Sequence, residues 1–128
     1  MIPIRLRKSL PFVEATIIAN GQKLVLRHVL LDTGSSSTLL KTDDLRSLGM
    51  EILPTDVLRN VRGIGGSETV IEKTIEGLRV GEVTVSPFLV QLGAVGYMDD
   101  LDGILGIDFI LKSKAVLDFA KREMRFGV

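Results

Sequence analysis

The chain has no cysteine, no tryptophan, a single histidine and no apolar run long enough to cross a membrane. The lack of cysteine excludes disulfides and thiolate metal sites, and it fits a reducing compartment. A membrane-spanning helix needs about 18 or more consecutive apolar residues. The N-terminal residues also lack the apolar core of a signal peptide. We therefore expect a cytoplasmic protein with no membrane segment in this chain.

Neither sign of charge is in excess, because 16 Lys and Arg residues balance 16 Asp and Glu residues. Binding to nucleic acid requires a basic excess or a basic face, so no nucleic-acid partner is expected. The 128 residues are 45% hydrophobic, with a mean hydropathy of +0.32. A chain of this size and composition can bury its own core and is not disordered. We expect one domain over residues 1–128.

Short apolar segments separated by turn residues predict a chain composed mainly of β-strands. Asn20-Gly21 is typical of a two-residue hairpin turn, and it separates apolar strands expected at 12–19 and 23–31. The other expected strands lie at 57–62, 69–75, 78–85, 88–92, 115–119 and 124–126. The last two of these form a terminal hairpin.

Two short helices are expected between the strands. Residues 42–49 form the first, with Thr42 as its N-cap and Gly49 as the residue that ends it. Residues 107–112 form the second. The expected fold is therefore mostly β, a closed, barrel-like lobe with one or two short helices.

The segment with the clearest chemistry is Asp32-Thr33-Gly34, which follows the apolar residues 29–31. A carboxylate placed where a buried strand ends can be a catalytic group. The alternative interpretation is an aspartate that only stabilises a turn or caps a helix.

Two further elements accompany this segment. Gly63-Ile64-Gly65-Gly66 separates two expected strands, and Ile104-Leu105-Gly106 precedes the second expected helix. Taken alone, the first element could be an ordinary hairpin turn, and the second could be a core strand that ends in a turn.

Together the three elements resemble the retropepsin-like aspartic proteases, which are single-lobe enzymes that work as homodimers. The resemblance spans nearly the whole chain and implies an aspartic endopeptidase that uses no metal or cofactor. In such an enzyme two nearby carboxylates share one proton, so that one acts as base and the other as acid. This chain has one Asp-Thr-Gly segment. The resemblance therefore implies two copies on a twofold axis, each supplying Asp32.

The resemblance also implies roles for the neighbouring residues. Thr33, buried beside Asp32, would form hydrogen bonds across the twofold axis, and Gly34 would direct its N–H at the carboxylate. An extended peptide substrate would be bound by the turn and a mobile flap, through Ser35, Gly63, Ile64, Gly65 and Gly66. The loop packed behind the catalytic turn would contain Ile104, Leu105 and Gly106.

Two positions depart from the retroviral pattern. Ser35 stands where those enzymes commonly have alanine, and its hydroxyl is expected to donate to Asp32, to stabilise the ionised form and to favour activity at acidic pH. Ile107 stands where they usually have an arginine that is important for the dimer. The dimer contacts of that arginine cannot be transferred to this chain.

The remaining ionisable residues give weaker indications. His28 is expected to be a structural strand residue, and Asp99, Asp100 and Asp102 are expected to be solvated, because they lack the spacing of a calcium loop. Two other functions stay open. The same fold could be a peptide-binding or dimerisation module with little or no catalysis, or a domain that is active only within a longer protein.

Overall fold

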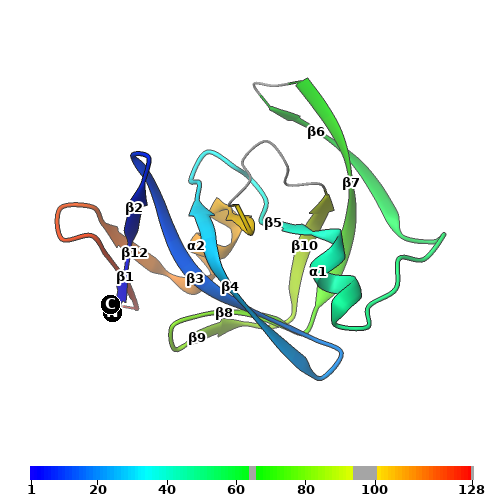
Figure 1. Ribbon diagram of the computed structural model, residues 1–128, viewed down its shortest axis with the longest axis horizontal. Helices are drawn as coiled ribbons and strands as arrows, with labels where there is room; N and C mark the ends of the chain where they lie inside the picture. Colours follow the sequence, from blue (N-terminus) through cyan, green and yellow to red (C-terminus); the bar gives the residue numbers. More distant parts are fainter. Residues whose placement is uncertain (64–65, 94–100, 128) are drawn as a thin grey trace.

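The computed structural model describes residues 1–63, 66–93 and 101–127, and in these ranges strands predominate (Figure 1). The strands form one sheet of ten strands and one of three, accompanied by two short helices. The prediction of a mostly β chain with one or two short helices is therefore confirmed.

The larger sheet follows an open path. Its order is β6 (Val57–Gly63), β7 (Gly66–Ile75), β10 (Phe88–Gly93), β5 (Leu39–Lys41), β11 (Gly103–Leu105), β4 (Gln22–Leu31), β3 (Leu10–Ala19), β8 (Gly77–Val80) and β9 (Val83–Val85). A further strand, β2 (Arg5–Arg7), pairs with β3. The β6–β7 hairpin extends away from the rest of the lobe, at the upper right of Figure 1. Closure into a barrel is not confirmed, because β6 and β9 are the two ends of the path and the described strands contain no pairing between them.

The smaller sheet brings the two ends of the chain together. Its order is β1 (Ile2–Pro3), β13 (Glu123–Phe126) and β12 (Ala115–Asp118), which confirms the terminal hairpin. The single strand expected at 78–85 is in fact two strands, β8 and β9. Gly81 separates them with φ +59°, a left-handed backbone conformation that favours glycine.

The β3–β4 hairpin turns at Asn20 and Gly21, as expected, with φ values of 52° and 71°. Positive φ at both positions is characteristic of a two-residue hairpin turn that matches the twist of the strands. Farther along, Ala15 pairs with Leu26 but Val13 pairs with Val29. One residue of β3 is therefore opposite two residues of β4, which is a β-bulge.

The first helix, α1 (Thr42–Ser47), begins one residue earlier than its capping signal suggested. Lys41 is the N-cap, since β5 runs directly into the helix, and it makes no capping hydrogen bond because its ammonium group has no acceptor. The assignment of Thr42 as N-cap was wrong. Gly49 ends the helical segment as predicted, with φ +81° and its N–H donating to the Arg46 carbonyl at 2.9 Å.

The second helix, α2 (Ile107–Ser113), confirms the short helix expected at 107–112. It ends at Lys114, which has left-handed backbone angles. Neither α1 nor α2, the helices of the described ranges, has the length and apolar character that crossing a bilayer requires.

β11 and the end of β4, residues 29–31, are buried on both faces, which explains the uninterrupted apolar run before Asp32. Leu31 and Leu105 belong to the main core on one face. Leu30 and Ile104 belong to a smaller cluster, which also contains Phe12 and Leu101. Successive residues of a strand point to opposite faces, so each strand contributes to both clusters.

Candidate active site

Asp32 lies directly after β4, beside the end of the parallel strand β11. Its N–H donates to the Leu105 carbonyl at 3.0 Å, which continues the pairing of Leu31 with Leu105. Its carbonyl accepts the N–H of Ser35 at 3.1 Å, and its Oδ1 accepts the N–H of Gly34 at 3.0 Å. The half-buried carboxylate is therefore held both by the sheet and by a tight turn.

Of the neighbouring residues, Gly34 makes the expected contact with the carboxylate, but Thr33 and Ser35 differ from expectation. Thr33 is exposed in the single chain, so its burial would require a second copy. The Ser35 hydroxyl donates to the Ser37 carbonyl at 2.8 Å, and the expectation that it donates to Asp32 was wrong. Serine hydroxyls readily bond to nearby backbone carbonyls, and here the turn brings such a carbonyl close.

Ile104, Leu105 and Gly106 lie against the Asp32 turn. Ile104 pairs with Leu30 of β4 on one side and with Leu39 of β5 on the other. A Cβ added at Gly106 would lie 2.5 Å from the Ser37 carbonyl oxygen and 2.9 Å from that of Ser35. No side chain fits there unless the backbone shifts, so glycine is what lets this segment approach the turn.

The same region contains a polar pair that the sequence interpretation missed. Thr38 is fully buried, and its hydroxyl accepts the Gly106 N–H at 3.1 Å and donates to Oδ1 of Asp108 at 2.8 Å. The Thr38 N–H donates to Asp108 Oδ2 at 3.0 Å, and Asp108 Oδ1 also accepts the Phe109 N–H at 2.8 Å. These bonds join the segment after the Asp32 turn to the start of α2. An acidic residue in the first turn of an expected helix was the available sequence signal.

The glycine-rich element lies in the β6–β7 hairpin. The two strands pair from Val57 and Glu72 up to Gly63 and Gly66, while Ile64 and Gly65 lie outside the described residues. Within the ranges the structure describes, no hydrogen bond or ion pair joins this hairpin to the Asp32 turn. The structure places Gly63 and Gly66 at the last described pair of a long hairpin.

Ionic contacts hold the base of this hairpin. Lys73 Nζ lies 2.9 Å from Asp56 Oδ1, and both side chains are only 13% exposed. The hydrogen bond from Lys73, together with that from the Leu53 N–H, lowers the pKa of the Asp56 carboxyl. Hydrogen bonds from Gln91 and Arg59 likewise lower the pKa of Glu72 on β7.

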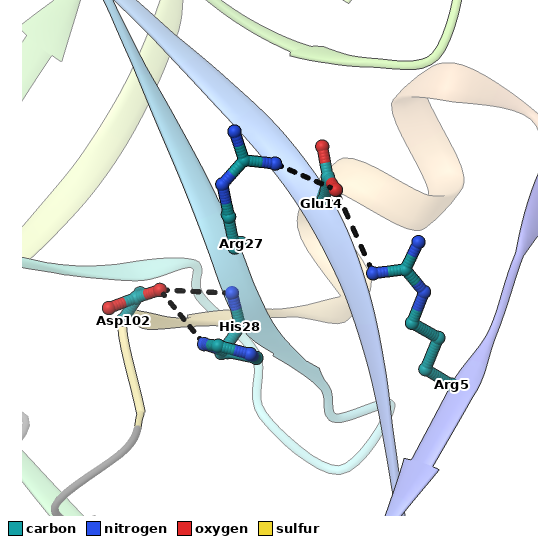
Figure 2. A network of polar contacts seen from close by, with 5 residues as sticks. All are labelled: Arg5, Glu14, Arg27, His28 and Asp102. Carbon is teal, nitrogen blue, oxygen red and sulfur yellow. Dashed lines mark hydrogen bonds and ion pairs between the residues drawn. The ribbon is translucent and has the colours of Figure 1, made fainter.

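Of the three aspartates that were expected to be solvated, Asp99 and Asp100 lie outside the described residues. Asp102 is not solvated as expected. Its Oδ2 accepts the His28 N–H at 2.9 Å and lies 3.7 Å from the imidazole Nδ1 (Figure 2). Its own N–H donates to the His28 carbonyl at 2.9 Å. His28 and Asp102 thereby fix the start of β11 against β4.

Acidic groups near α1 do not assemble a metal site. Burial raises the pKa of the Asp44 carboxyl, and the negative charges of Asp102 and Asp43 add to this effect while Lys41 opposes it. In the part of the chain that the structure describes, no group of three or more His, Cys, Asp or Glu side chains could hold a metal ion.

Comparisons with known proteins agree with this geometry. The sequence profile of a family described as aspartyl protease matches residues 13–109, a range that contains the Asp32 turn, the β6–β7 hairpin and β11. Among solved structures, a retropepsin-like aspartic protease from Rickettsia conorii is similar, with a TM-score of 0.66 and 22% identity. The similarity covers 92% of this chain and 83% of that chain, and at this identity it shows the fold alone. No curated protein sequence matches.

Proposed function

Because the chain belongs to the aspartyl protease family and has the retropepsin-like fold, we propose that it is a homodimeric aspartic endopeptidase. Residues 1–128 form its single protease domain. The observation that carries the proposal is the geometry of Asp32, a half-buried carboxylate that accepts the Gly34 N–H at the end of a buried strand. One chain supplies one such carboxylate, so the dyad requires Asp32 from each of two copies.

In the proposed reaction the two Asp32 carboxyls share one proton and titrate as a pair. The ionised carboxylate removes a proton from water as the water oxygen attacks the peptide carbonyl carbon. The protonated carboxyl donates to the carbonyl oxygen, which gives a tetrahedral gem-diol. When the C–N bond breaks, a proton passes to the leaving nitrogen, and the products are a carboxyl and an amine. The water supplies every atom added, and no metal or cofactor takes part.

The neighbouring residues act by positioning. Gly34 orients the Asp32 carboxylate, and the exposed Thr33 contributes to the contact between the two copies. Ile104, Leu105 and Gly106 support the turn from behind, which agrees with the hydrogen bond from Asp32 to Leu105. A substrate peptide in extended conformation is bound by main-chain hydrogen bonds between the floor and the flap, through Ser35, Gly63, Ile64, Gly65 and Gly66.

The proposal is tested by cleavage of casein or a peptide library with the wild type and Asp32→Asn. We expect the variant to lose a factor of about 10²–10⁴ or more in kcat, since an amide cannot act as the base or acid. Asp43→Asn is the matched control, because Asp43 is 92% exposed on α1, and it should keep full activity. Cleavage that survives Asp32→Asn, or a wild type that cleaves nothing while it sediments as a stable dimer, would reject the proposal.

A further inference from the structure

A hollow with a volume of about 300 Å³ lies beside β3, lined by residues of β1, β2, β3 and β4 and by Gly81. None of the residues that line it belongs to the Asp32 turn, to the β6–β7 hairpin or to β11. The hollow therefore has no part in the proposed catalytic site.

The hollow exists because two strands that pair with the same edge of β3 leave a gap. β2 pairs with β3 as far as Arg5 and Phe12, and β8 resumes the pairing at Thr16 and Arg79. Between these points, no strand of the described ranges pairs with the outer edge of β3. Within this stretch Val13 and Ala15 are only 2% exposed, and Glu14 is the part-exposed residue. An unpaired strand edge at Glu14 offers backbone groups to which one residue of an extended chain can bond.

Two arginines and one glutamate lie around this gap, on β2, β3 and β4 (Figure 2). Arg27 and Arg5 both approach the same oxygen of Glu14, at 3.3 Å and 3.8 Å. The three side chains carry a net charge of +1. Each guanidinium has five N–H donors, and the two side chains are 68% and 65% exposed. Most of these donors are therefore available to a second carboxylate, which a guanidinium binds in a two-pronged geometry.

The wall of the hollow is apolar at Ile2 and Pro3, whereas Phe12 and Val13, which also line it, are only 3% and 2% exposed. Water occupies about 30 Å³ per molecule, so the hollow has room for roughly ten water volumes, or about one amino-acid residue with its carboxylate. The hollow thus combines a cationic end, an apolar wall and an unpaired backbone edge.

We propose that this hollow binds the C-terminal residue of an extended peptide. Arg5 and Arg27 receive the terminal carboxylate, the edge of β3 bonds to the peptide backbone, and the apolar wall contacts the last side chain. The free backbone edge favours a peptide over a simple fatty acid, which has no amide groups to pair with it. The proposal shares no residue with the catalytic site and does not depend on activity.

The test is a titration of ¹⁵N-labelled protein with the tripeptide acetyl-Gly-Gly-Leu, followed by backbone amide chemical shifts. We expect the shifts at residues 13–15 and at Gly81, and we expect the C-terminally amidated peptide to bind about tenfold or more weakly. Equal affinity of the amidated peptide, hexanoate binding as tightly as the peptide, or shifts confined to Thr33 and Gly34 would each overturn the proposal.

Substitutions give a second test, in which the affinity is expected to change in opposite directions. Arg27→Gln, or Arg5→Gln in its place, should weaken binding about tenfold, whereas Glu14→Gln should strengthen it several-fold because it removes the competing carboxylate. Arg46→Gln on α1 removes the same charge elsewhere and should leave the affinity unchanged. If Arg27→Gln and Glu14→Gln shift the affinity in the same direction, or not at all, the assignment is wrong.

Discussion

The Asp108 carboxylate accepts two hydrogen bonds from Thr38, one from its N–H at 3.0 Å and one from its hydroxyl at 2.8 Å, across 70 positions of sequence. Thr38 is fully buried and its hydroxyl in turn accepts the Gly106 N–H. Asp108 thus completes the hydrogen bonding of a buried threonine that lies between the Asp32 turn and β5.

Replacing Asp108 with alanine should therefore lower the free energy of unfolding by about 2–4 kcal/mol, because two buried donors lose their acceptor. Asp108→Asn should cost less, since the amide oxygen still accepts one of the two bonds. Urea denaturation of both variants measures the difference. A loss below about 0.5 kcal/mol for the alanine variant would show that Thr38 finds other partners.

Gly106 and Gly34 should respond differently to substitution by alanine. At Gly106 the added Cβ meets backbone at 2.5 Å, so Gly106→Ala should cost about 2–3 kcal/mol of stability. At Gly34 the nearest atom is the Asp32 carboxylate oxygen, at 3.3 Å. A side chain can move, so Gly34→Ala should cost about 1 kcal/mol or less but displace the carboxylate and lower the proposed activity. Thermal melts combined with peptide cleavage assays separate the two effects.

Asp56 should make the fold sensitive to acid. Its pKa is lowered in the folded state by the hydrogen bond from Lys73 and by that from the Leu53 N–H. A lowered folded pKa stabilises the protein above the unfolded value, which is about 4, and this contribution is lost as pH falls through the folded pKa.

Accordingly, Asp56→Asn should reduce the urea midpoint at pH 7 and should flatten its decline as pH falls below about 4. The exposed Asp43, replaced by asparagine, is the control and should leave the slope unchanged. If the urea midpoints of the wild type and of Asp56→Asn decline with pH at the same slope, the role of this ion pair is contradicted.

Thr33 should affect association rather than folding. It is exposed beside Asp32 in the single chain, so Thr33→Ala should leave the melting temperature of dilute protein nearly unchanged. In the proposed dimer the same change removes hydrogen bonds between copies and should raise the dimer Kd about tenfold. Sedimentation velocity over a concentration series measures this, with Ser36→Ala, another exposed residue of the same turn, as the control.

The features that the sequence predicted correctly depend on neighbouring residues. Local backbone preferences, which are independent of the rest of the chain, determine the hairpin turn at Asn20-Gly21, the end of α1 at Gly49 and the start of α2. The Asp32 turn was located in the same way, from an apolar run that ends in an acidic residue.

The features that were missed depend on contacts between distant segments. Asp102 bonds to His28 across 74 positions, and Thr38 bonds to Asp108 across 70. The first turn of the expected helix drew attention to Asp108, but no local pattern indicates the partner in either pair, because each pair arises from the pairing of β11 between β4 and β5. The Ser35 hydroxyl was misassigned for a related reason, since its choice between two nearby acceptors depends on the exact course of the turn.

The β-bulge in β4 decides on which side of the sheet the Asp32 side chain lies. Before the bulge, the even-numbered Leu24 and Leu26 contact the main core; after it, the odd-numbered Val29 and Leu31 do so. Asp32 is even-numbered, so a regular strand would have turned its side chain into the main core. Loss of a single residue from β4 would therefore invert the strand beyond that point and bury the carboxylate among aliphatic side chains. The one extra residue at the bulge therefore determines which side chains of β4 face the main core and which face away from it.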